Sequence, residues 1–448
     1  MASTAIDSSV LGPLFGTPEM RDIFSDRNMV QKWIDTEAAL AQAQGEIGMI
    51  PDAAAAEIRR KADASLLDYA AIGEHYKSSI TIVPLLKEFK KVLDGGAGEY
   101  VHWGATSQDI VDTGLILRIR EAHALLSDRL AACSLAARDL AAKHRDLVMP
   151  GRTHVQHALP ITFGLKAATW VFELENHERR FKECAPRLFI GQMSGAVGTL
   201  ASMGDKGLQV QERTMELLGL GVTPVHWHST RDHVAEFVGL LALAAGTATR
   251  IAREVLTLQR TETGELEEPF FMGKVGSSTM PHKRNPQVCE NVIALCRLVR
   301  AQAPVAVECM AVENERDWSC EVAEWDFVPA ACIHLDAALE KTADILRNLI
   351  VYPRRMEANL DLLHGLMLSE SVMIRLAEKM GRLTAHDVVY ETSMQAFEKG
   401  IPMAEALCAD ARVAAHFTRE EIGRMLEPHS YLGIAAASVD RTLARPRP

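Results

Sequence analysis

One short segment, residues 276–286 with the sequence GSSTMPHKRNP, concentrates more reactive chemistry than the rest of the chain. Its glycine and prolines favour a turn, because glycine permits unusual backbone angles and proline interrupts regular structure. Such a loop can present successive backbone N–H groups to an oxyanion, while Lys283 and Asn285 hold a carboxylate. The alternative interpretation is a polar surface loop that caps the following helix.

Two further polar segments interrupt apolar helical patterns. In residues 101–109 (VHWGATSQD), Thr106 and Ser107 begin a helical pattern and can offer hydroxyls and free backbone N–H groups to an anion. A plain helix N-cap remains the alternative there. Residues 151–160 (GRTHVQHALP) open another helical pattern with two histidines in one turn. That density favours general acid–base chemistry or carboxylate binding over a purely structural histidine.

Helical periodicity dominates the chain, and segments that alternate with period two are few and short. Ser25 is predicted to cap a helix that buries Val30, Trp33, Ile34 and Ala38 on one face and stops before Pro51. Longer helices are predicted at about 107–145, 161–187, 230–265, 286–310 and 327–350. Several of them are apolar on more than one face, which indicates burial inside a bundle or between subunits.

We therefore predict an all-α fold with three helical domains. Residues 1–105 form an N-terminal domain, residues 106–355 a central bundle of long helices, and residues 356–448 a small C-terminal domain. A chain of 448 residues is long enough for several domains and a large core.

Composition limits the classes of function. The net charge of −11 and the lack of basic runs predict a protein that does not bind nucleic acid. Eight cysteines without a C-x-x-C pair indicate reduced thiols in a cytoplasmic protein. No signal peptide is evident at the N-terminus, and the apolar stretch 238–249 is too short to span a bilayer, so no membrane association is expected. The pair His226 and His228 lacks a further ligand cluster, so no metal is predicted.

Together the three polar segments resemble those of the fumarase/aspartase superfamily, whose Gly-Ser-Ser-x-x-Pro-x-Lys-x-Asn signature matches residues 276–285. The resemblance implies a helical homotetramer with a shared multi-helix core and active sites built from three subunits. It implies elimination from a succinyl group of a small dicarboxylate or tricarboxylate, through an aci-carboxylate, without a cofactor. Such chemistry needs positioned donors for the developing oxyanion and a base within reach of the carbon-bound proton.

The resemblance also assigns roles to residues. Ser277 would be the general base, with Ser278 as the adjacent candidate, and His154 would donate a proton while paired with Glu290. A neighbouring carboxylate orients an imidazole and favours its protonated form. The substrate-binding residues implied by the motifs are His102, Thr106, Ser107, Gln156, Ser278, Lys283 and Asn285.

Within the superfamily, the chain is similar to the branch that contains adenylosuccinate lyase and 3-carboxy-cis,cis-muconate cycloisomerase. Three departures argue against a purine nucleotide substrate: Leu14-Phe15 replace an Arg-Tyr pair, residues 78–81 lack a histidine, and Trp325 replaces a phosphate-binding arginine. A phosphate dianion needs paired donors, so their loss is costly.

Three hypotheses about function remain open. The first is a lyase that cleaves the C–N bond of an N-substituted aspartate other than adenylosuccinate and releases fumarate. Glu290 beside His154 favours it, because that pair occurs in members that protonate a leaving group. The second is a lactonising 3-carboxy-cis,cis-muconate cycloisomerase, which the Ala-Glu-Trp segment at 323–325 resembles. The third is a catalytically inactive helical scaffold.

Overall fold

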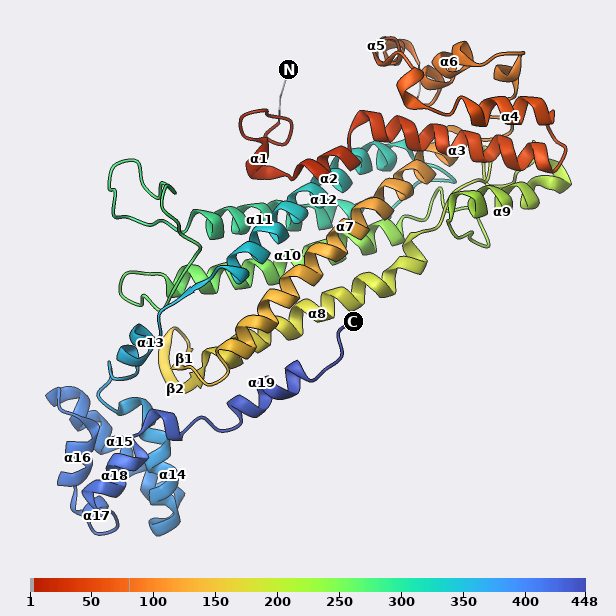
Figure 1. Cartoon of the computed structure of the whole chain (residues 1–448). Helices are drawn as coiled ribbons and strands as arrows, with labels where there is room; N and C mark the ends of the chain where they lie inside the picture. The colour runs from red at the N-terminus through yellow and green to blue at the C-terminus, as the bar shows by residue number, and fades with distance from the viewer. Residues whose placement is uncertain (1–3, 80) are drawn as a thin grey trace. The chain divides into compact units, whose positions relative to one another are not determined.

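The computed structural model describes residues 4–79 and 81–448 and is predominantly helical, with only short strands (Figure 1). Ile80, in the segment 78–81, lies outside the described residues. The α-helices are α1 (Gly12–Phe15), α2 (Pro18–Ile23), α3 (Asp26–Glu46), α4 (Asp52–Arg60), α5 (Tyr69–His75), α6 (Val83–Val92), α7 (Ser107–Lys143), α8 (Phe163–Leu188), α9 (Gly207–Leu218), α10 (Asp232–Leu258), α11 (Gln287–Glu308), α12 (Trp318–Arg347), α13 (Pro353–Leu360), α14 (Ser369–Met380), α15 (Arg382–Lys399), α16 (Met403–Ala409), α17 (Ala411–Ala414), α18 (Arg419–Met425) and α19 (Ala435–Leu443). The strands are β1 (Val148–Thr153), β2 (Gln156–Thr162), β3 (Leu266–Glu267) and β4 (Ile350–Val351).

The predicted all-α class is confirmed, and each predicted long helix has a counterpart. Two boundaries differ. Helix α12 begins at Trp318 rather than at residue 327, because the Asp317 carboxylate accepts a hydrogen bond from the Ser319 N–H at 2.9 Å and caps the helix early. Helix α10 ends at Leu258 rather than at residue 265, since the chain then turns back into strand β3.

The chain divides into two compact units, each made of three segments. One unit comprises Met1–Ala131, Asn176–Thr249 and Asn291–Glu340. The other comprises Ala132–Glu175, Arg250–Glu290 and Lys341–Pro448. The five long helices α7, α8, α10, α11 and α12 contribute residues to both units. The three domains proposed from the sequence, with boundaries near 105 and 355, remain a prediction.

Helix α3 in the first unit follows the sequence prediction closely. The Ser25 hydroxyl caps it by accepting a hydrogen bond from the Asn28 N–H at 3.3 Å. Its buried face includes Val30, Trp33 and Ile34, each at most 3% exposed. The helix ends at Glu46, before Pro51. This end is expected, because proline cannot continue a helix.

Helix α10 is long and apolar enough to cross a membrane by length and composition alone, but 61% of its apolar window is buried inside the protein. Val238, Leu241 and Ala245 are fully buried within the first unit. The stretch 238–249 therefore belongs to a mostly buried helix, and within it Leu243 is 53% exposed in the single chain.

A buried ion cluster connects three long helices in the first unit. Arg231, one residue before α10, donates to both carboxylate oxygens of Asp112 on α7 at 2.8 and 3.0 Å. It also donates to Glu324 on α12 through Nε at 2.8 Å. All three side chains are 1% exposed, so the two carboxylates depend on the guanidinium for compensation.

In the second unit, β1 and β2 form an antiparallel hairpin, and β3 pairs with β4. Helices α14, α15, α16 and α18 close over a separate apolar core, whose fully buried members include Val372, Leu376, Met403 and Leu407. All eight cysteines are free thiols, and seven of them are buried.

Replacing Arg231 with methionine is expected to lower the free energy of unfolding by about 3–5 kcal/mol, because two buried carboxylates lose their shared partner. Denaturant unfolding measures the change. The matched control is Arg187→Met, since Arg187 forms a solvent-exposed pair with Glu236 and its loss should cost less than about 1 kcal/mol. Equal losses in the two variants would contradict the assigned importance of the buried cluster.

Candidate active site

The first polar segment is a loop that is hydrogen-bonded to side chains of helix α3. His102 has a left-handed backbone conformation with φ of 61°. Its N–H donates to Glu37 Oε2 at 3.0 Å, and its Nδ1 lies 2.7 Å from Glu37 Oε1. The Gln44 side chain donates to the Trp103 carbonyl oxygen at 2.7 Å. Two residues of one buried helix face therefore fix two consecutive residues of the loop.

Asp109, in the first turn of α7, organises the surroundings of this loop. Its fully buried carboxylate accepts hydrogen bonds from the N–H groups of Thr106, Ser194 and Gly195 at 3.0, 2.9 and 2.9 Å. It also lies 2.9 Å from His228 Nε2, which must donate because a carboxylate only accepts. The sequence placed Asp109 in a motif but did not indicate that it joins its own loop to two distant segments, around residues 194–195 and at His228.

The accessible part of this loop lies beside the Arg316 guanidinium and the N-terminus of helix α7, which both favour an anion. Thr106 Oγ1 accepts a hydrogen bond from Arg316 Nη1 at 2.6 Å. Ser107 is the first residue of α7, where unpaired backbone N–H groups favour an anion. The side chains of His102, Thr106 and Ser107 are accessible but not fully exposed. This arrangement can bind a carboxylate. Arg316 was not a predicted site residue, and its only sequence signal was a cation in a polar connection between helices.

The second polar segment lies on the β1–β2 hairpin, not at a helix start. His154 and Val155 form its turn, with φ of 49° and 64°, and both are exposed. Gln156 pairs with Thr153 across the turn. Sequence reasoning missed the hairpin because the turn contains no glycine or asparagine, the residues that usually adopt this backbone conformation.

An ion pair fixes the base of this hairpin within the second unit. Arg152 donates to both carboxylate oxygens of Glu265 at 2.6 and 2.9 Å, and Glu265 is fully buried. Asn359 also donates to Glu265 at 2.7 Å. Burial and the charge of Arg152 lower the pKa of His157 and so favour the neutral imidazole. His154 is thus the histidine of the turn that faces solvent.

The third segment, residues 276–286, is an irregular loop, as predicted. Ser277 Oγ accepts hydrogen bonds from the N–H groups of Thr279 and Met280 at 3.4 and 3.1 Å. Asn285 closes the loop by donating to the Gly276 carbonyl oxygen at 2.7 Å. A Cβ on Gly276 would lie 2.5 Å from the Lys283 carbonyl oxygen, so only glycine fits where the two ends of the loop approach each other. Lys283 and Ser278 are exposed.

A buried carboxylate anchors this loop where helix α11 begins. Glu268, 2% exposed, accepts from the N–H groups of Val288 and Cys289 at 3.2 and 2.9 Å. Lys274 donates to it at 2.9 Å. Cys289 is fully buried, and burial, followed by the charge of Glu268, raises the pKa of its thiol, so it is a poor nucleophile. Both ends of the loop are therefore held while its centre stays exposed.

The predicted site residues divide between the two units. His102, Thr106 and Ser107 lie in the first unit. Those in the second unit are His154, Gln156, Ser277, Ser278, Lys283, Asn285 and Glu290. Among the residues that the structure describes, no hydrogen bond or ion pair joins His154 to Ser277 or to Glu290, and Glu290 is exposed. The His154–Glu290 pair remains a prediction.

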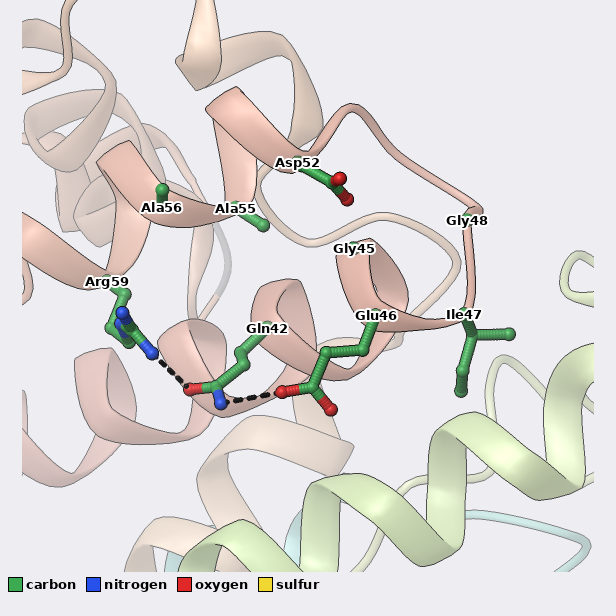
Figure 2. Close-up of a pocket in the computed structure, with 9 residues that line it drawn as sticks. All are labelled: Gln42, Gly45, Glu46, Ile47, Gly48, Asp52, Ala55, Ala56 and Arg59. Atoms are coloured by element: carbon green, nitrogen blue, oxygen red, sulfur yellow. Dashed lines mark hydrogen bonds between the residues drawn. The ribbon is translucent and has the colours of Figure 1, made fainter.

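Two other features of the described residues add nothing to the predicted site. Within residues 4–79 and 81–448, no group of three or more histidine, cysteine or acidic side chains could hold a metal ion. A pocket between α3 and α4 is lined by Gln42, Gly45, Glu46, Ile47, Gly48, Asp52, Ala55, Ala56 and Arg59 (Figure 2). In it, Arg59 donates to Gln42 and Gln42 donates to Glu46, so these polar groups satisfy one another. None of the predicted site residues lies there.

Comparison with known proteins places this geometry in a family. A family model described as Lyase matches residues 15–301, and one described as Adenylosuccinate lyase C-terminus matches residues 365–442. The chain is 39% identical to N-acetyl-S-(2-succino)cysteine lyase of Dickeya dadantii, over 99% of this chain and 98% of that protein. It is 40% identical to adenylosuccinate lyase of Methanothermobacter thermautotrophicus, over 96% of each.

A solved structure agrees with these likenesses. The 3-carboxy-cis,cis-muconate lactonizing enzyme from Pseudomonas putida superimposes with a TM-score of 0.90 and 37% identity, over 96% of this chain and 97% of that one. Full-length matches at this identity extend through all three polar segments. The chain therefore belongs to the fumarase/aspartase superfamily of lyases, in the branch that contains adenylosuccinate lyase and 3-carboxy-cis,cis-muconate cycloisomerase.

Proposed function

We propose that this enzyme cleaves the C–S bond of an S-substituted 2-succinyl compound by β-elimination, releasing fumarate and a thiol. The full-length similarity to an N-acetyl-S-(2-succino)cysteine lyase supports a sulfur leaving group. Sulfur also suits the chemistry, because a thiol has a pKa of about 8.5 and leaves as a stable thiolate, whereas an amine must be protonated before it leaves.

The observation that carries the elimination chemistry, whichever leaving group departs, is the environment of the Ser277 hydroxyl. Its oxygen accepts two backbone N–H groups, from Thr279 and Met280, and this arrangement stabilises an alkoxide. An activated serine in this exposed polar loop can remove the proton from the carbon next to a substrate carboxylate. Ser278 is exposed and has no comparable pair of donors in the described residues, which favours Ser277 as the base.

The remaining steps follow from charge balance. Loss of the carbon-bound proton gives an aci-carboxylate, whose negative charge Lys283 and the loop N–H groups stabilise. The electron pair then forms the carbon–carbon double bond as the C–S bond breaks and the sulfur leaves with its bonding pair. His154, oriented by Glu290, donates the proton that converts the departing thiolate to a thiol.

We further propose that the active enzyme is a cytoplasmic homotetramer whose sites combine polar segments from different subunits. Large apolar side chains on the long helices support burial by further copies of the chain: Leu135, Phe172, Leu243, Leu298 and Val307 are 38–60% exposed in the single chain. A bundle helix that is apolar on several faces must be covered by other helices.

The substrate of adenylosuccinate lyase fits this chain less well. Trp325 stands on α12 next to Glu324 and one turn after Glu321. A phosphate dianion at this position would lack the paired donors of the arginine that Trp325 replaces.

Three classes of substrate distinguish the proposed reaction from its alternatives. N-substituted aspartates, including adenylosuccinate, test C–N cleavage, 3-carboxy-cis,cis-muconate tests lactonisation, and S-(2-succino)cysteine derivatives test the proposal. We expect the sulfur compounds to give the highest kcat/KM, by about tenfold or more, measured from ultraviolet absorbance and product analysis. Faster turnover of an N-substituted aspartate or of the muconate would overturn the sulfur assignment. Turnover of none would favour an inactive scaffold.

Replacing Ser277 with alanine should lower kcat by about 10²–10⁴-fold, because the base is lost while the loop backbone remains. Thr279→Ala is the matched control, since Thr279 contributes only its backbone N–H to this turn and should keep near-normal turnover. Size-exclusion chromatography checks that both variants keep their assembly. A Ser277→Ala enzyme with near-normal kcat would remove this residue from the base role.

Mixing two inactive variants tests whether subunits share sites. If His154 and Ser277 of one site come from different chains, subunit exchange between His154→Ala and Ser277→Ala proteins should restore roughly a quarter of the sites. Activity after reversible dissociation measures the effect, and tagged subunits confirm the exchange. Confirmed exchange without any recovered activity would contradict shared sites.

A further inference from the structure

We propose that Glu37 is a positioning residue that keeps His102 cationic and leaves its Nε2–H free to bind a substrate carboxylate. The inference deepens the proposed function and rests on it, because it assumes that the loop 101–106 receives one carboxylate of a succinyl compound. Glu37 itself lies beneath the loop and would not touch the substrate.

The geometry of the pair is unusually specific. The Glu37 side chain is 1% exposed, and both of its oxygens are used by the same residue. One oxygen accepts the His102 backbone N–H, which holds the backbone in its left-handed conformation. The other faces the ring at 2.7 Å, and because a carboxylate only accepts, Nδ1 must donate. The imidazole is therefore fixed in position, and Nε2 is its remaining polar atom.

Charge gives the pair a second consequence. A buried carboxylate needs a compensating charge, and His102 is its only ion-pair partner among the residues that the structure describes. Burial by itself lowers the pKa of His102, but the charge and hydrogen bond of Glu37, together with the charge of Asp109, outweigh burial and raise that pKa. Glu37 on α3 and Asp109 on α7 are the charged groups acting on the ring, and Arg316 binds nearby Thr106.

These groups define what the loop can bind. A cationic imidazole, the Arg316 guanidinium and the first N–H groups of α7 are three features that each favour an anion. The side chain of His102 is 18% exposed, enough for Nε2 to reach a ligand while Nδ1 stays covered. A planar carboxylate matches this set of donors.

Fumarate binding by calorimetry, from about pH 6 to about pH 9, tests the inference without requiring turnover. Glu37→Gln removes the charge at nearly constant shape, so the pKa of His102 should fall. The Kd of this variant for fumarate should rise by about tenfold at neutral and alkaline pH and approach that of the unmodified enzyme at acidic pH. His102→Asn, which tolerates left-handed backbone, should bind weakly with little dependence on pH. The double variant should match His102→Asn, because Glu37 acts through the imidazole.

Two further variants keep the test decisive. Glu37→Asp retains the charge and should keep tighter binding at alkaline pH than Glu37→Gln, so it serves if the glutamine variant misfolds. Glu46→Gln, on the same helix in an exposed pair with Arg213, should leave the Kd unchanged. Unaltered binding by Glu37→Gln, or an effect of Glu37→Gln that persists when His102 is asparagine, would overturn the inference. Failure of the unmodified enzyme to bind fumarate at any pH would instead reject the proposed function.

Discussion

Buried carboxylates hold every part of this structure that carries reactive side chains. Glu37 and Asp109 fix the loop around His102, Glu265 fixes the hairpin through Arg152, and Glu268 fixes the start of α11. Each is at most 2% exposed, and each compensates its burial with backbone N–H groups or a cation. A carboxylate in a low-dielectric setting binds such donors strongly and tolerates few alternative positions. Flexible polar segments thereby become rigid at their ends.

This organisation separates framework from chemistry. The buried carboxylates lie on helices or beside short strands, while the groups proposed to bind substrate lie on the loops between them. A substitution in the framework therefore acts on catalysis indirectly, through the position or protonation of a second residue. It also allows related chains to keep the same framework and change substrate at positions such as Trp325, where neighbouring side chains set the local charge.

The helical framework was largely predictable from the sequence because its signals are local. The cap at Ser25, the buried face of α3 and the long apolar helices each follow from residues a few positions apart. The pairs that organise the site do not. Glu37 and His102 are separated by 65 positions, and Asp109 and His228 by 119. Spacing carries no information about such pairs, so the sequence identified the polar segments but not the acids that hold them.

Two proposed functional histidines stand in left-handed backbone, His102 with φ of 61° and His154 with φ of 49°. For a residue with a Cβ this conformation costs about 1–2 kcal/mol, whereas glycine adopts it freely. Selection for thermal stability alone would thus favour glycine at position 154, whereas at position 102 a glycine would leave the buried Glu37 carboxylate without its ion-pair partner. The enzyme therefore gives up stability for an imidazole at the hairpin turn, while at the loop 101–106 the same kind of backbone strain is offset by a buried ion pair.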